Sequence, residues 1–263
     1  MLSELQLRNF RCFEALRVDF SPGFNFFIGR NGQGKTSILE GACVLLRLQS
    51  QRSSTLAPAI RSGGKSFAVA GRCDGHLLDF RYSSLRRKLS FDDAEQRTAA
   101  EYLRLARVVS LANADIELVR GGSDARRRFL DFLGVQIEPT YRGTLRAYER
   151  ALRSRNALLK APQPNLRALA AYDQPLIEHG AALSLLRQRL VTKLTPFVLA
   201  AHGEVSGSSE AANVSFAPGN QLEFAADLAA SHTQELRLRQ TVVGPHRDDL
   251  TLLVDGMPAA QYA

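Results

Sequence analysis

The sequence has few of the features that would place a protein in a membrane or a secretion pathway. Its longest uninterrupted apolar runs are about five residues, far short of the roughly 18 that a membrane-spanning helix needs. Near the N-terminus an acid, Glu4, stands where a secretion signal would carry basic residues, and no apolar block follows it. We therefore expect a cytoplasmic protein with no membrane partner.

Cysteine is also scarce. Cys12, Cys43 and Cys73 form no CxxC pair and lie among apolar residues, so we expect reduced, buried thiols rather than a disulfide framework or a metal site. Internal repeats and low-complexity segments are absent as well. No metal-ligating cluster is predicted.

What the chain does have is a basic surplus and enough apolar material for a core. Its 263 residues are 45% hydrophobic, and 34 Lys and Arg against 26 Asp and Glu give a formal charge of +8. Such a charge suits nucleic acid as a partner, because each neutralised phosphate releases counterions. A solvated basic surface explains the charge equally well, so a sequence motif is needed to distinguish the two interpretations.

The N-terminal part has mainly β character. Residues 2–10, 16–20 and 24–28 are predicted strands, the last of them buried, and helical spacing of apolar residues follows over residues 36–48. From Ser66 to Phe91 the pattern indicates a meander of three strands with a hairpin turn at Asp74-Gly75.

Beyond about residue 113 the chain turns into long helices. Apolar residues at helical spacing around Tyr148 and Leu190, with Ala161-Pro162-Gln163-Pro164 between them, predict two helices folded as a hairpin. Strand character returns at residues 250–254. We therefore predict an α/β domain, residues 1–112 and 241–263, that carries an inserted and mainly helical lobe, residues 113–240.

One motif points directly to chemistry. Between the predicted buried strand and the helix, the chain matches G-x-x-x-x-G-K-[ST] in full with Gly29, Arg30, Asn31, Gly32, Gln33, Gly34, Lys35 and Thr36. Glycines allow backbone N–H groups to turn toward phosphate oxygens at a helix N-terminus. Lys35 would reach the β and γ phosphates, and the Thr36 hydroxyl would bind Mg²⁺. A nucleoside triphosphate is the expected ligand.

Two other segments resemble parts of ATPases but are better explained as turns. Ser62-Gly63-Gly64-Lys65 has signature-like residues, but it precedes the meander instead of an acidic strand. Asp255 ends an apolar strand like a magnesium-binding aspartate, yet Asp255-Gly256 is a favoured hairpin turn and no glutamate follows.

Longer blocks carry a family resemblance. Leu7-Arg8-Asn9-Phe10-Arg11 ahead of the phosphate loop resembles the opening of SMC-like ATPases. Three further blocks resemble the RecF family: residues 117–131 with Arg126-Arg127-Arg128-Phe129-Leu130-Asp131, residues 141–160, and residues 241–250 with Gly244-Pro245-His246-Arg247-Asp248-Asp249. The match runs along the whole chain in order.

This resemblance implies an ABC/SMC-like P-loop ATPase head that uses ATP and Mg²⁺. It implies an ATP-dependent homodimer that binds DNA near gaps or single-strand to double-strand junctions, with RecR and RecO as partners. Recombinase loading, replication restart and the SOS response to DNA damage are the processes in which such a protein would act.

The resemblance also suggests further site residues. Arg11 matches an arginine that lies near the phosphates in SMC-like proteins, although a solvated arginine is an equally good interpretation. Arg126, Arg127, His246 and Arg247 are candidate contacts to DNA or to an interface, with a solvated or structural role as the alternative.

Two departures from the family pattern matter. Asn113-Ala114-Asp115 replaces a usual Pro-Glu-Asp, and the sequence ends at Ala263, before the expected signature and acidic Walker B strand. We therefore expect the catalytic residues beyond Ala263, and we expect this chain to bind ATP without hydrolysing it at a useful rate. The alternatives are a nucleotide-binding DNA or interaction module without turnover and, more distantly, a small-molecule P-loop kinase.

Overall fold

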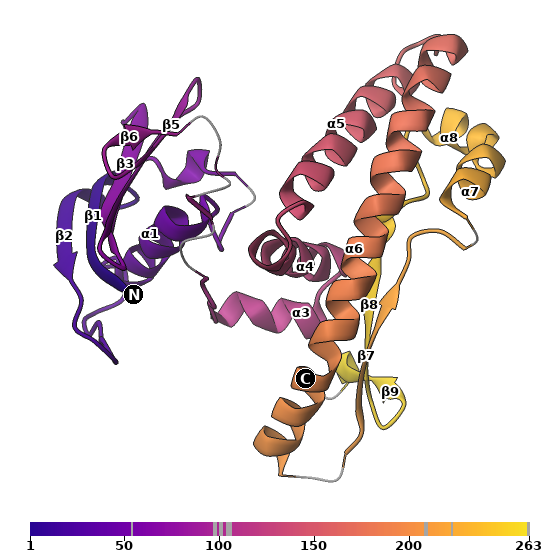
Figure 1. Cartoon of the computed structure of the whole chain (residues 1–263). Coiled ribbons are helices and arrows are strands. Elements are labelled where there is room, and N and C mark those ends of the chain that lie inside the picture. The colour runs from indigo at the N-terminus through magenta and orange to yellow at the C-terminus, as the bar shows by residue number, and fades with distance from the viewer. Residues whose placement is uncertain are drawn as a thin grey trace. The chain divides into compact units, whose positions relative to one another are not determined.

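A computed structural model describes residues 1–53, 55–96, 99, 102–103, 107–207, 210–221 and 223–261. The chain forms two compact units, Met1–Ala112 and Asn113–Ala263 (Figure 1). Among the described residues, no helix combines the length and the apolar character needed to cross a membrane.

The first unit is built on an antiparallel sheet. Its strand order is β2-β1-β3-β4-β5-β6, with β1 Leu2–Phe10, β2 Phe13–Asp19, β3 Ser66–Cys73, β4 His76–Ser83, β5 Arg87–Phe91 and β6 Ala94–Glu95. Asp74 and Gly75 have φ values of 50° and 84°, and Cys73 pairs with His76, so they form a two-residue turn. The predicted meander is confirmed.

Helix α1 (Lys35–Arg47) packs on β1 and β3. Its apolar face buries Val44 and Leu45 against Leu5, Leu7 and Val69, which confirms the helix expected from the sequence. The approach to β1 is close at Gly41, where an added Cβ would lie 2.6 Å from Leu7 Cδ2. A larger residue at this position would push α1 away from the sheet.

The prediction of a buried strand at residues 24–28 is wrong. No strand forms there, and the side chains of Phe24, Phe26 and Ile28 are 89%, 80% and 95% exposed. Phe27 alone of the apolar residues in this segment packs against the core, with its ring 6.2 Å from that of Phe20. A strand needs a hydrogen-bonded neighbour, and the described residues supply none for this segment.

The cysteine prediction is right for two residues and wrong for one. Cys43 and Cys73 are buried free thiols, whereas Cys12 is exposed. It lies in the β1–β2 turn at the end of the hairpin, where its neighbour Phe13 packs against the core instead. Burial raises the pKa of the Cys43 thiol to about 11.

The second unit is mainly helical. Its helices are η2 Asn113–Ile116, α3 Glu117–Arg120, α4 Ser123–Ile137, α5 Tyr141–Leu159, α6 Leu166–Ser206, α7 Phe224–Ala230, α8 His232–Leu238, η3 Pro245–Arg247 and η4 Ala259–Gln261. Helices α5 and α6 run side by side (Figure 1), and Tyr148 and Leu183 belong to the core that includes both helices. The predicted helix hairpin is confirmed.

A small sheet completes this unit. Its order is β7-β8-β9, with β7 Ala212–Ala217, β8 Asp249–Val254 and β9 Met257–Pro258. Leu250 of β8 shares a core with Leu130, Leu190 and Val191 of the helices. The sequence predicts that residues 241–263 belong to the N-terminal unit. Residues 241–261 instead belong to the second unit, and residues 262 and 263 lie outside the described residues. The reason is that β8 finds its pairing partner in β7.

Candidate functional site

The phosphate-loop motif leads directly into α1, and two of its glycines are required by the backbone. Gly32 and Gly34 have φ values of 82° and 94°, a region that residues with a side chain rarely adopt. A Cβ on Gly34 would also lie 2.7 Å from Cys12 Sγ and would overlap the Phe13 ring. The end of the β1–β2 hairpin therefore packs directly against the last glycine of the loop.

The backbone donors of the loop are free. Among the described residues, no hydrogen bond engages the backbone N–H groups from Gly32 through Ser37, and the first helical bond runs from Ile38 N to Gly34 O at 3.0 Å. Consecutive free N–H groups at a helix N-terminus attract anions, because the helix dipole adds positive potential there. This arrangement fits a chain of phosphate groups.

Lys35 and Thr36 lie in the first turn of α1. The Lys35 ammonium group donates to Gly29 O at 2.6 Å and to Arg30 O at 2.7 Å, so it folds back across the loop. The Thr36 side chain is exposed at this end of the helix. In the described part of the chain no cluster of three or more His, Cys, Asp or Glu residues could hold a metal by itself. A cation at Thr36 would need phosphate oxygens as further ligands.

Arg11 is paired inside the first unit. It donates through Nε and Nη2 to both carboxylate oxygens of Glu40, at 2.8 and 2.6 Å, and through Nη1 to Pro58 O at 2.7 Å. Its φ of 54° places it in the tight turn between β1 and β2. The two-pronged bond therefore ties the end of the hairpin to α1, one turn beyond Thr36.

Sequence reasoning missed Glu40. Its carboxylate is fully buried and also accepts from Ser50 Oγ at 2.6 Å and Arg52 Nη1 at 3.3 Å. A signal was present, since Glu40 interrupts an apolar helix just after the phosphate loop. The pairing partners come from segments distant in sequence, so the sequence did not identify them.

Arg126 and Arg127 are engaged with their own unit. Arg126 donates to both carboxylate oxygens of Asp249, at 2.6 and 3.0 Å, and Arg127 donates to Asp248 O at 2.7 Å. The hydrogen bond to Asp249 raises the pKa of Arg126. These contacts join α4 to the start of β8, which favours a structural role for both arginines.

His246 is largely buried, whereas Arg247 is exposed. His246 Nε2 lies 3.0 Å from Thr241 O, which can only accept, so Nε2 carries the proton and Nδ1 accepts from the Tyr148 hydroxyl at 2.7 Å. Burial lowers the pKa of His246 to about 4. The histidine is therefore neutral and holds η3 against α5.

A buried ion cluster surrounds this turn. Arg187 of α6 donates to Asp131 at 2.8 Å, to Asp248 at 2.9 Å and to Pro245 O at 2.6 Å. Burial raises the pKa of Asp248, although Arg187 opposes that shift. The Gly-Pro-His-Arg-Asp-Asp block is thus the junction at which α4, α5 and α6 meet the small sheet.

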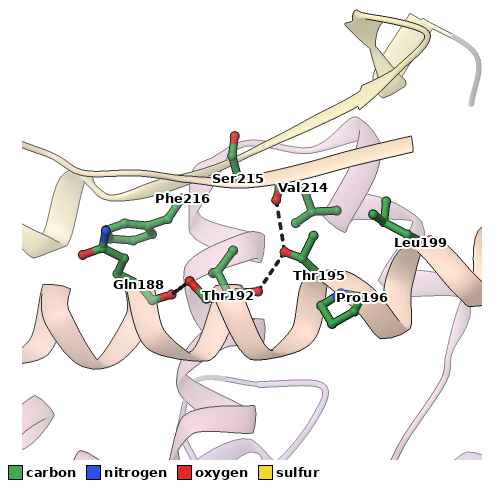
Figure 2. Close-up of a pocket in the computed structure, with 9 residues that line it drawn as sticks. Gln188, Thr192, Thr195, Pro196, Leu199, Val214, Ser215 and Phe216 are labelled. Carbon is green, nitrogen blue, oxygen red and sulfur yellow. Dashed lines mark hydrogen bonds between the residues drawn. The ribbon is translucent and has the colours of Figure 1, made fainter. Parts of the chain in front are cut away.

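A pocket of about 430 Å³ lies between α6 and β7. Figure 2 shows Thr192, Thr195, Ser215 and Gln188 around it, and the Thr195 hydroxyl lies 3.2 Å from Val214 O. Its lining has no charged side chain, so it could not neutralise a phosphate chain. The free N–H groups of residues 32–37 make the better candidate site.

Glu40→Ala should destabilise the protein by about 3–5 kcal/mol, because Arg11 and Arg52 would lose a buried carboxylate. Glu14→Ala is the matched control, since Glu14 is 79% exposed and pairs with Arg61 at 3.5 Å; it should cost at most about 1 kcal/mol. Urea unfolding monitored by circular dichroism measures both. Equal costs for the two variants would contradict the assigned role of Glu40.

The buried neutral His246 should make stability depend on pH. Its pKa is about 4 in the folded protein against 6.5 when exposed, so its contribution is complete above pH 6.5 and is lost as the pH falls toward 4, by about 3 kcal/mol in total. His246→Gln removes this titration and retains a donor for Thr241 O. The difference between the free energies of unfolding of parent and variant should change over this range, and a constant difference would contradict the assignment.

Comparison with known proteins places this geometry in a family. Residues 4–101 match a family model described as an AAA domain. The DNA replication and repair protein RecF of Acidothermus cellulolyticus is 35% identical over 100% of this chain and 77% of its own length. RecF of Lactococcus lactis is 32% identical over 99% of this chain and 74% of its own length.

Solved structures agree. The structure described as the recombination mediator protein RecF-ATPrS in the RecFOR pathway covers 100% of this chain and 76% of its own, with a TM-score of 0.88 and 26% identity. The corresponding RecF-ATP structure has a TM-score of 0.87 and 25% identity. These matches confirm the predicted α/β fold of the ABC/SMC-like P-loop type. On this evidence the chain belongs to the family of the DNA replication and repair protein RecF.

Proposed function

We propose that this protein binds ATP with Mg²⁺ at Gly29–Thr36 and uses the nucleotide to control its binding to DNA during recombinational repair. The observation that carries the proposal is the row of free backbone N–H groups from Gly32 through Ser37 at the start of α1. Membership in a family with a RecF-ATP structure supports ATP as the nucleotide.

Each part of the loop has a distinct task in this proposal. The N–H groups donate to phosphate oxygens, and Lys35 exchanges the carbonyls of Gly29 and Arg30 for the more negative β and γ phosphates. The Thr36 hydroxyl would be a ligand of Mg²⁺, and the ion would neutralise phosphate charge when bound. Arg11, held by Glu40, keeps the β1–β2 hairpin against Gly34 and so maintains the shape of the loop.

For the partners, we propose sequence-independent DNA at gaps or junctions, a second copy of the protein joined in an ATP-dependent way, and RecR and RecO. The formal charge of +8 supports a polyanionic partner. The RecFOR pathway named for the matched structures supports a role in recombination mediation. Recombinase loading, replication restart and SOS induction in the cytoplasm belong to the same proposal.

A second candidate is nucleotide-dependent binding without hydrolysis by this chain. Asp255, the one acid with a Walker-like position in the sequence, lies in the β8–β9 turn with a φ of 49° and accepts from Ala211 N at 2.8 Å. This favours the turn interpretation over a role in holding Mg²⁺. Water activation and charge neutralisation at the γ phosphate need additional groups.

Lys35→Ala should weaken ATP binding by about 10- to 100-fold, because a charge-assisted bond to phosphate is lost. Lys65→Ala is the matched control, since Lys65 is an exposed lysine that also follows a glycine but lies outside the phosphate-loop motif. Titration calorimetry with ATP and Mg²⁺ compares them. Equal affinity of Lys35→Ala and the parent would refute the site, while thermal unfolding of all three proteins verifies that they fold.

DNA binding should be electrostatic. The logarithm of the association constant should fall linearly with the logarithm of salt concentration, with little dependence on base sequence. Fluorescence anisotropy with two unrelated duplexes of equal length, each with and without ATP, measures this. Strong preference for one duplex, or affinity that ignores salt, would contradict the proposal.

A further inference from the structure

Helix α5 has two faces of opposite character. Tyr148, Ala151 and Arg155 are buried against the rest of the second unit. The exposed residues are Arg146, Arg150 and Arg153 of the helix and Lys160, the C-cap residue that follows its last turn. At about 100° per residue, the four exposed residues point away from the side that carries Tyr148. They form a basic row on the outer face, which is not part of the ATP site.

The row lacks the partners that arginines elsewhere in this unit have. In the described part of the chain, Arg146 and Arg150 form no ion pair, and Arg153 has only Glu149, at 3.6 Å and in an exposed setting. Arg155, on the opposite face, donates to Glu235 at 2.6 Å and to Asp173 at 2.8 Å. Three neighbouring positive charges on one helix face repel each other, so a dense negative partner would stabilise them.

The chemistry of this face distinguishes nucleic acid from protein. All of α5 is described, and it has no exposed large apolar side chain, whereas the centre of a protein interface is rich in apolar and aromatic groups. The row from Arg146 to Lys160 is about 21 Å long at 1.5 Å per residue. Along the axis of a DNA duplex this length contains about six phosphates of one strand, at 3.4 Å of axis per phosphate. Each guanidinium group can therefore reach a separate phosphate.

We propose that the outer face of α5, defined by Arg146, Arg150, Arg153 and Lys160, is a contact surface for the phosphate backbone of DNA. This inference rests on the proposed DNA-binding function and assigns it to a surface. Binding through this row should not depend on base sequence, because arginine contacts to phosphates position a protein without specifying bases.

The test compares two triple variants of the full chain. Arg146→Ala, Arg150→Ala and Arg153→Ala together remove three charges from the row; Arg189→Ala, Lys193→Ala and Arg237→Ala remove three exposed charges from α6 and α8. Anisotropy with a duplex of about 30 base pairs gives affinity and its salt dependence. The first variant should reduce the slope of log K against log salt by about 2 to 3 and lower affinity at least tenfold. The second should change the slope by less than about 1.

A third variant, Arg146→Lys with Arg150→Lys and Arg153→Lys, retains the charges and should recover most of the affinity, because lysine still binds phosphate as a point charge. An unchanged slope in the alanine variant, or equal losses in both alanine variants, would overturn the assignment to α5 while leaving DNA binding intact. Absence of DNA binding by the parent would instead refute the proposed function. Circular dichroism shows whether each variant remains folded.

Discussion

Charged side chains that are buried, and therefore need partners, organise both units of this protein. Glu40 in the first unit and Asp248 in the second are fully buried carboxylates, and each is held by arginine. Removing one member of such a pair costs about 3–5 kcal/mol, a large part of the stability of an ordinary domain. The loops that these pairs hold, at residues 11–13 and 244–248, are therefore fixed in place with little freedom.

In the first unit this constraint shapes the phosphate loop. The bond between Arg11 and Glu40 holds the end of the hairpin. Cys12 and Phe13 at that end pack against Gly34, the N-cap residue of α1. The free N–H groups are thus arranged before any phosphate is bound. A site that is organised in advance binds with less loss of conformational entropy. Glu40 contributes to the site although it lies behind the loop and not in it.

The second unit has two groups of arginines, one bonded inside the unit and one exposed. The residue type alone does not show to which group an arginine belongs. Arg126, Arg155 and Arg187 are hydrogen-bonded inside the unit, whereas Arg146 and Arg150 are exposed on the outer face of α5. Within the run of arginines at 126–128, the sequence offers Arg126 and Arg127 as candidate contacts to DNA or to an interface, with a solvated role as the alternative. Both are occupied by the main chain and side chains at the start of β8, because the small sheet packs against α4.

The sequence by itself determined what depends on neighbouring residues. Local spacing, glycine positions and apolar periodicity predict the phosphate-loop motif, helix α1, the turns at Asp74-Gly75 and Asp255-Gly256, and the α5–α6 hairpin. The structure contains each of them.

The tertiary structure decided what depends on distant partners. Phe24, Phe26 and Ile28 have a strand-like pattern, but the described residues form no strand beside them, and residues 249–254 pair with β7 in the second unit. The tertiary structure also determines the environments of Arg11 and His246. Folding brings Glu40 to Arg11, and it brings Tyr148 and Thr241 to His246. Hydrogen-bond and ion-pair partners far apart in the chain leave no periodic signal, which is why they could not be predicted from it.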